Sequence, residues 1–230
     1  MSIRIFSKHL KSQNWFGVFL DFFVVVLGIF IGLQVSDWNQ SRIDRQDAAY
    51  HLNFMHDELS ISMKSATAEI EQHEATMMNS IGAAMLLSKG DWDPAEEQRF
   101  REQIFSTFEF WGPKHLPVSL RRMIDDGKLD LIESKELQNA ILSFESAYLE
   151  AIEQTKTSYS YSLEFTPKIT SSMKFYGPNI VSTAEELTEN LVLRSAVRDK
   201  AIWQRIQLDV LKDLQAARGA LKEILEANSS

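Results

Sequence analysis

The stretch Trp15–Val35 reads WFGVFLDFFVVVLGIFIGLQV, and its only charged side chain is Asp21. As a helix, these 21 residues span about 30 Å, which is the thickness of the hydrocarbon core of a bilayer. Trp15 and Trp38 flank the run, where indole rings favour the headgroup region. The sequence therefore predicts a transmembrane helix over residues 15–36, with these two tryptophans as its interface anchors.

A cleaved signal peptide is the alternative interpretation of an apolar run near the N-terminus. Signal peptides carry an apolar region of about 7–15 residues that ends in a small-x-small cleavage site. This run is longer, and it ends in Leu33-Gln34-Val35-Ser36, which lacks that pattern. A retained membrane anchor is therefore favoured.

The charges on either side of the anchor indicate its orientation. Three Lys or Arg residues lie within residues 1–14, and two follow the anchor at positions 42 and 45. Positively charged flanks of a transmembrane helix tend to stay in the cytoplasm. We therefore expect residues 1–14 to be a cytoplasmic tail and residues 37–230 to be an extracytoplasmic domain.

One face of the predicted anchor carries small and polar residues. At 100° per residue, five side chains fall within a sector of about 60°; they are Gly17, Asp21, Gly28, Gly32 and Asn39. Gly28 and Gly32 form a GxxxG pair, which lets a second helix approach closely. An acid facing lipid near the membrane centre costs about 2.5–3.5 kcal/mol, and a hydrogen bond to another helix relieves that cost.

Two interpretations of this face remain open. In one, Asp21 is merely tolerated near the membrane surface and the GxxxG pair occurs by chance. In the other, the five residues form a packing stripe that contacts a second copy of the chain or another membrane protein. We favour the packing stripe, because the glycines, the acid and the asparagine share one helical phase.

The composition beyond the anchor is typical of helices. The whole chain has five prolines, nine glycines and no cysteine, which excludes disulfides, thiol catalysis and thiolate metal sites. Its net charge is −8, and no cluster of Lys and Arg compensates locally. Such a domain lacks the basic surface that nucleic acid requires, and anionic lipid headgroups repel it.

Start and stop signals divide this domain into helices. Asp93-Pro94-Ala95-Glu96 has the order of a helix start, and Ser182-Thr183-Ala184-Glu185-Glu186 holds two overlapping capping boxes. Pro167 is expected to kink or restart the helix that contains it. The expected helices cover about 41–87, 93–111, 119–127, 134–167 with a continuation toward 176, and 191–227.

The last of these helices has an almost heptad apolar stripe. Its members are Ala196, Trp203, Ile206, Val210, Leu214, Ala217, Leu221 and Ile224. Long amphipathic helices bury such stripes against one another. The predicted fold class is therefore all-α, with one N-terminal transmembrane helix followed by an antiparallel bundle of long helices.

Two segments carry a resemblance. Asp21 is followed by Gly28-Ile29-Phe30-Ile31-Gly32-Leu33-Gln34 and by Trp38-Asn39, and the second segment is Asp126-Gly127-Lys128-Leu129-Asp130-Leu131-Ile132. Together they are similar to segments of an uncharacterised family of bacterial single-pass membrane proteins, although Gln40 stands where that family has Glu. The resemblance implies a helical domain on one anchor in the bacterial inner membrane. It implies no activity, because none is established for that family.

A search of the sequence for catalytic chemistry finds no constellation. His51 and His56 are about 140° apart on a helix, a poor arrangement for sharing a metal ion. No nucleophile elbow, phosphate loop or HExxH motif is present. Tyr159 and Tyr161 lie in a polar stretch where a ligand groove or partner surface is conceivable. We expect no enzyme activity, no cofactor and no metal, and the sequence does not identify a small-molecule ligand.

Three functions remain in competition. The leading one is a membrane-anchored helical interaction or sensing module that self-associates or pairs with a partner through its transmembrane helix. The alternative is an ion-coupled component of a membrane complex that uses Asp21, since the layout resembles the small subunits of proton-driven stator complexes. An enzyme is the third and least favoured.

Overall fold

Helix α2 begins at Trp15 and runs without a break to Lys89. The two helices predicted over 15–36 and 41–87 are therefore one, and the expectation of a helix start at Ser41 is wrong. The Ser41 hydroxyl donates a hydrogen bond back to the carbonyl of Asp37 at 2.8 Å, as serine does inside a helix. No proline or glycine stands between positions 33 and 81 to interrupt the helix.

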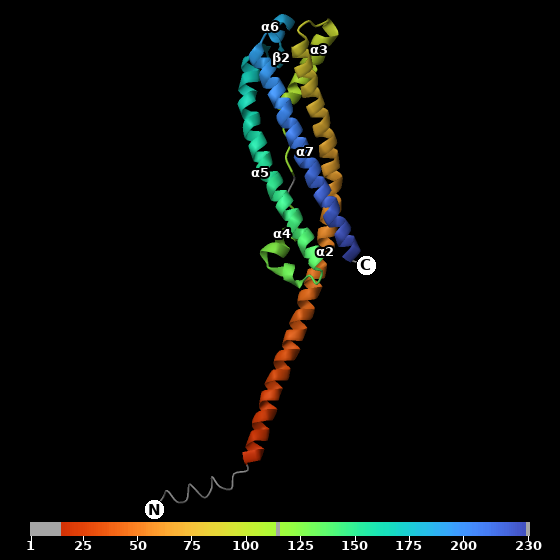
Figure 1. The fold of residues 1–230 in the computed structure, drawn as a ribbon, viewed down its shortest axis with the longest axis vertical. Coiled ribbons are helices and arrows are strands. Elements are labelled where there is room, and N and C mark those ends of the chain that lie inside the picture. The colour runs from red at the N-terminus through yellow and green to blue at the C-terminus, as the bar shows by residue number, and fades with distance from the viewer. Residues whose placement is uncertain (1–14, 114–115, 229–230) are drawn as a thin grey trace, which may run out of the picture. The chain divides into compact units, whose positions relative to one another are not determined.

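The computed structural model describes residues 15–113 and 116–228, which are almost entirely helical (Figure 1). The predicted all-α class is confirmed. After α2 the elements are α3 (Pro94–Gln103), η1 (Ile104–Phe108), α4 (Val118–Asp125), η2 (Lys128–Leu131), α5 (Lys135–Ser171), β1 (Phe175–Tyr176), β2 (Asn179–Ile180), α6 (Ala184–Thr188) and α7 (Leu191–Asn228).

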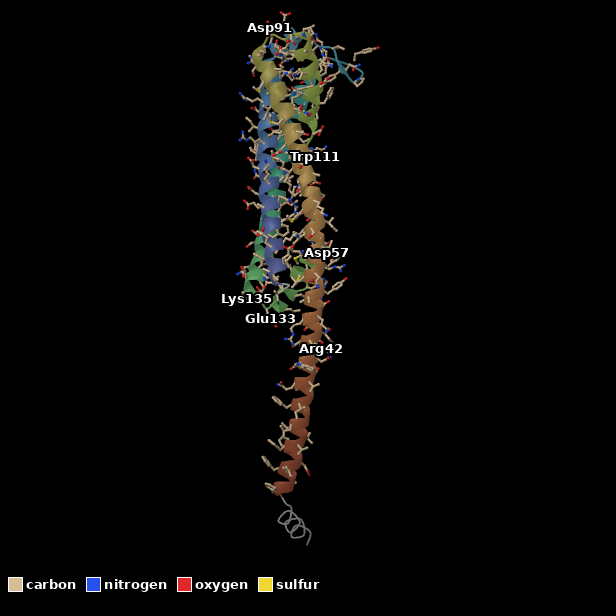
Figure 2. The ribbon with its side chains drawn as sticks, turned by 90° about the vertical axis from the view of Figure 1, so that its right-hand side faces the viewer. Arg42, Asp57, Asp91, Trp111, Glu133 and Lys135 are labelled. Atoms are coloured by element: carbon tan, nitrogen blue, oxygen red, sulfur yellow. The ribbon has the colours of Figure 1, made fainter. Side chains whose placement is uncertain are left out.

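The chain divides into two compact units between Ala49 and Tyr50. The described part of the first unit is a single stretch of α2, and its large apolar side chains are exposed. Figure 2 draws the side chains of this segment, from Arg42 toward the N-terminal end, pointing outward on several sides. By length and composition, this is the one helix in the described residues that could cross a membrane.

The second unit is a bundle of three long helices: residues 50–89 of α2, then α5 and α7 (Figure 1). Hydrogen-bonded pairs show that α7 runs antiparallel to both of the others, so α2 and α5 run in the same direction. The pairs are Lys200–Ser162 and Gln207–Thr155 between α7 and α5, and His73–Gln204 and Met63–Gln215 between α2 and α7.

The connection between α3 and α4 explains the shared direction of α2 and α5. The side chain of Glu109 accepts a hydrogen bond from Thr76, whereas Ser119 contacts Glu58. The chain thus returns along α2 by many residues before α5 begins. Helix α5 therefore runs along the bundle in the same direction as α2.

The interior of the bundle contains two apolar clusters. The first lies near the start of α5 and includes Met55, Leu59, Phe144 and Leu221. The second lies near the other end of α5 and includes Phe100 and Leu187. Burial of such side chains stabilises each end by about 1.5–3 kcal/mol per large residue.

Helix α3 starts as predicted but ends earlier. Asp93 and Glu96 form the capping box, with the Glu96 amide donating to Asp93 at 2.8 Å. The helix tightens into η1 at Ile104 and stops at Phe108, so the predicted end at Trp111 is wrong. Glu109 is extended because Gln204 donates to its carbonyl and Thr76 donates to its carboxylate.

Helix α4 is capped by a remote carboxylate and not by the serine near its start. Glu58 of α2 accepts hydrogen bonds from the amides of Val118 at 3.1 Å and Ser119 at 2.9 Å, and also from the Ser119 hydroxyl. These amides have no partner within the helix, and a negative charge there also opposes the helix dipole. Gly127, at φ +66°, follows the end of the helix.

Two further predictions about helix ends are partly right. Ser134 caps α5 as expected, but α5 continues through Pro167 to Ser171 without restarting. Of the two overlapping capping boxes, only the one between Thr183 and Glu186 forms. The Ser182 hydroxyl instead accepts a hydrogen bond from the Lys174 amide at 2.8 Å. This bond lies beside a short hairpin, formed by the two-residue strands β1 and β2, that the sequence did not predict.

Candidate functional site

The predicted packing stripe lies on the first unit. Asp21 and Asn39 are exposed, and Asn39 accepts a hydrogen bond from Arg42 at 3.4 Å. A Cβ atom added at Gly28 or Gly32 meets nothing within 4 Å, so the described chain places no second backbone against these glycines. Trp38 is exposed, and Gly17 is half-buried. Trp15 begins the helix, but its side chain lies outside the described residues. The stripe and its role remain a prediction.

The buried face of α7 differs from the stripe predicted for it. Ten buried residues step by three and four along the helix: Leu193, Val197, Lys200, Gln204, Gln207, Leu211, Leu214, Arg218, Leu221 and Leu225. Four of these ten are polar, so the pattern of apolar residues in the sequence predicted the wrong face of α7 as the buried one. Five members of the predicted stripe are only half-buried: Trp203, Ile206, Val210, Ala217 and Ile224.

Polar residues of the other two long helices meet these positions midway between the apolar clusters. We call this group the buried polar layer. Its members are Lys200, Gln204 and Gln207 on α7, Thr155, Ser158 and Ser162 on α5, and His73, Thr76 and Ser80 on α2.

Lys200 is the one cation at the centre of this layer. Its ammonium group donates to the carbonyl of Ser162 at 3.1 Å and to the hydroxyl of the same residue. Burial disfavours the charged form and lowers the pKa of Lys200 to about 8. No carboxylate of the described chain forms an ion pair with it.

His73 and Gln204 connect the layer to the segment after η1. Nε2 of His73 lies 2.8 Å from the Gln204 carbonyl, and burial lowers the pKa of His73. The Gln204 amide donates to the carbonyls of Ser106 and Glu109 at 2.9 and 3.1 Å. Nδ1 of His73 and Oε1 of Gln204 have no hydrogen-bond partner among the described residues. Burying polar atoms without a partner costs free energy, so the layer stabilises the bundle less than an apolar one of the same size would.

A serine beside a lysine of lowered pKa is chemically a nucleophile and a base. Here the side chains of both Ser162 and Lys200 are closed off, since each residue is only 2% exposed. A substrate cannot reach them without opening the bundle. In the described residues, no group of three or more His, Asp or Glu side chains is placed to hold a metal ion.

An accessible groove lies on the outer surface between α2 and α7. Its volume is about 800 Å³, and the apolar side chains that line it include Ile81, Met85 and Ile202. Four cations line it: Lys89 from α2, and Arg194, Arg198 and Arg205 from α7. We call this the α2/α7 groove.

The three arginines share one face of α7, because spacings of four and seven residues keep their directions within about 40°. Arg198 pairs with Asp199 at 2.9 Å. Neither Arg194 nor Arg205 forms an ion pair with a carboxylate of the described chain. On the α2 side, the hydrogen bond to Glu96 raises the pKa of Lys89 and keeps it charged.

The groove continues toward the middle of α2. A second hollow of about 430 Å³ shares Ile81 and Arg205 with the first and is lined by Met77, Met78 and Leu208. The ion pair between Lys212 and Glu74, at 2.5 Å, lies at its far end. From Glu74 to Lys89 the helix rises about 22 Å at 1.5 Å per residue.

Other side chains considered from the sequence have structural partners. Tyr161 stacks on Trp203 with ring centroids 4.4 Å apart, and Tyr159 packs against Phe110 at 5.3 Å. His56 lies 3.2 Å from Glu226 of α7. The α2/α7 groove was missed, although the spacing of Arg194, Arg198 and Arg205 on one helical face is visible in the sequence.

No protein family, curated protein or solved structure matches this chain. The geometry therefore defines only its class. It is an all-α protein. One of its helices contains a segment apolar enough to cross a membrane and continues into a helical bundle that carries a groove lined by basic and apolar residues.

Proposed function

We propose that this chain is a membrane-anchored helical interaction module of the bacterial inner membrane. Residues 15–36 hold it in the bilayer and pair with a second copy or another membrane protein, and the bundle recruits a further partner at the α2/α7 groove. The observation that carries the proposal is the continuity of α2, which contains the exposed apolar span and also forms one wall of the groove.

The free-energy cost of exposing apolar side chains to water supports the proposed membrane anchor. The most apolar part of α2 has no buried residue, so a water-soluble chain would expose a row of large side chains including Phe16, Phe22 and Ile29. Exposed apolar patches of such size mark membrane or protein contacts. A bilayer removes this surface from water, and a helix satisfies every backbone polar group within it.

The absence of cysteine allows a sharp test of anchoring and orientation. Two single-cysteine variants of the full chain, Ser7→Cys and Asn228→Cys, are produced in bacterial cells. We expect both to stay in the membrane fraction after alkaline carbonate washing. A membrane-impermeant maleimide should label Asn228→Cys in spheroplasts and should label Ser7→Cys only after lysis.

Release of the chain by carbonate contradicts the anchor. Labelling of Ser7→Cys in sealed spheroplasts, with protection of Asn228→Cys, reverses the orientation and leaves the anchor intact. The unmodified chain has no thiol and serves as the background control.

A further inference from the structure

Beside the buried polar layer, polar side chains of α2 and α7 are buried while several apolar side chains line the α2/α7 groove. On this part of α2 the buried residues include His73 and Ser80, whereas the apolar Met77 and Ile81 face the groove. On α7, Lys200 is buried while Ile202 lines the groove. A helix pair that needed only its own core would place these side chains the other way round. Met85 and Ile202 in particular stay exposed, so they are available for a contact outside the bundle.

The length and the lining of the groove suit a helix. The surfaces of α2 and α7 lie side by side and form a groove about 22 Å long. This length matches four turns of a third helix packed into the groove. Three methionines line it, Met77, Met78 and Met85, and Met85 is 69% exposed. Methionine side chains adapt their shape to a partner, and exposed ones are frequent in helix-binding grooves.

The charges of the groove select an acidic partner. Four cations surround its wider end, although the chain as a whole carries −8. Arg198 is already paired with Asp199, whereas Arg194 and Arg205 have no ion pair within the described chain. A carboxylate from outside would supply that partner, and guanidinium groups bind carboxylates with two parallel hydrogen bonds.

We infer that the α2/α7 groove binds an amphipathic helix of a partner protein. The apolar face of that helix packs against the apolar side chains of the groove, and Asp or Glu residues of the helix flank this face. The acids concentrate toward the end lined by Arg194, because this arginine has no ion pair within the described chain, and the other end holds Glu74 and Asp209. This inference rests on the proposed function, since it names the partner of the same groove.

The test uses the full chain in nanodiscs of zwitterionic lipid. The probe is a fluorescent peptide of about 15 residues, four turns long, with leucines at helical spacing and glutamates between them. A matched peptide carries lysines in place of the glutamates, and empty nanodiscs report binding to lipid. We expect saturable binding of the glutamate peptide and at least about tenfold weaker binding of the lysine peptide.

Two double variants locate the site. Arg194→Glu with Arg198→Glu reverses the charge of the groove, and we expect binding of the glutamate peptide to weaken at least about tenfold. Arg121→Glu with Arg122→Glu is the matched control, because these arginines are exposed on α4 and lie outside the groove. Met85→Gln with Ile202→Gln removes apolar contacts at exposed positions and should also weaken binding. Circular dichroism and thermal unfolding check that each variant folds.

Equal binding of the two peptides, or equal loss in the groove and control variants, overturns the inference. So does arginine-dependent binding of dodecyl phosphate in the absence of any peptide binding, which would assign the groove to a lipid-like anion. Failure of the peptide to bind a chain that remains in carbonate-washed membranes rejects this inference but leaves the anchor part of the proposed function standing.

Discussion

Lys200 is a buried cation with no counter-ion among the described residues, and its hydrogen bonds to Ser162 offset only part of the desolvation cost. Its pKa falls from 10.5 to about 8, which corresponds to a cost of roughly 3 kcal/mol at neutral pH. We expect Lys200→Met to raise the free energy of unfolding at pH 7 by about 1–3 kcal/mol. Urea unfolding of the full chain, followed by circular dichroism, measures this.

The same residue makes stability depend on alkaline pH. The unfolded chain binds a proton at Lys200 up to its ordinary pKa of 10.5, whereas the folded chain loses it near 8. Stability should therefore rise as pH increases from 8 to 10.5. This rise should disappear in Lys200→Met, and an unchanged pH profile in that variant contradicts the assignment.

His73 should make the stability of the fold depend on pH in the acid range. Burial lowers its pKa below the ordinary 6.5, so the unfolded chain takes up a proton first and stability falls as pH drops below 6.5. The carboxylates whose pKa is lowered, including Glu96 and Glu186, contribute stability above pH 4.5, and this contribution is lost only as pH falls below 4.5. We expect His73→Gln to flatten the loss of stability between pH 4.5 and 6.5, measured by thermal unfolding. Parallel profiles of variant and wild type would show that His73 is not the group responsible.

Residue types in the bundle core could be predicted only where they are apolar. Leu214 and Leu221 were expected on the apolar stripe of the last helix and are buried. Lys200 could not be placed, because a hydrophobic pattern assigns polar residues to the solvent face. Its burial depends on a tertiary partner, Ser162 of α5, which is far away in the sequence.

At the scale of elements, helix ends can be predicted where the capping residue is close in the sequence, and not where it is remote. The capping boxes at Asp93 and Thr183 formed as expected because all their atoms lie within four residues. The cap of α4 comes from Glu58, about 60 residues earlier, and no local signal reveals it. The continuity of α2 was missed because a membrane anchor and a bundle helix were treated as separate elements.

The cap of α4 gives a test at this scale. Glu58→Gln keeps the size of the side chain but removes the charge that accepts from two α4 amides and the Ser119 hydroxyl. We expect a loss of about 1–2 kcal/mol in the free energy of unfolding, as for removal of a helix cap or a charged hydrogen bond. Asp57→Asn is the matched control, since Asp57 is exposed on the adjacent position of α2. Equal effects of the two substitutions would assign the loss to surface charge and not to the cap.

At the scale of the whole molecule, the chain uses its apolar residues for two kinds of surface. Two buried clusters hold the bundle together, whereas apolar residues of the first unit and of the α2/α7 groove remain exposed in the described chain. The fold class and the apolar span follow from composition and periodicity alone. The groove does not, because it depends on which faces of α2 and α7 the buried polar layer turns inward.

The packing stripe of the anchor gives the last prediction, and it concerns assembly. Gly28→Leu with Gly32→Leu fills the face on which a second helix backbone would approach, where an added Cβ meets nothing in the described chain. We expect this variant to reduce self-association or partner pairing in the membrane, measured by energy transfer between labelled copies and by crosslinking. Val26→Leu with Phe30→Leu, on the opposite face, should leave association unchanged.

The acid in the same stripe separates packing from ion coupling. If Asp21 forms an interhelical hydrogen bond, Asp21→Asn keeps a polar partner and should preserve most of the association, whereas Asp21→Leu should reduce it. If Asp21 instead couples an ion, Asp21→Asn should abolish activity of the assembled complex without altering assembly. A chain that stays strictly monomeric in membranes and is indifferent to all four substitutions at these three positions has no packing stripe.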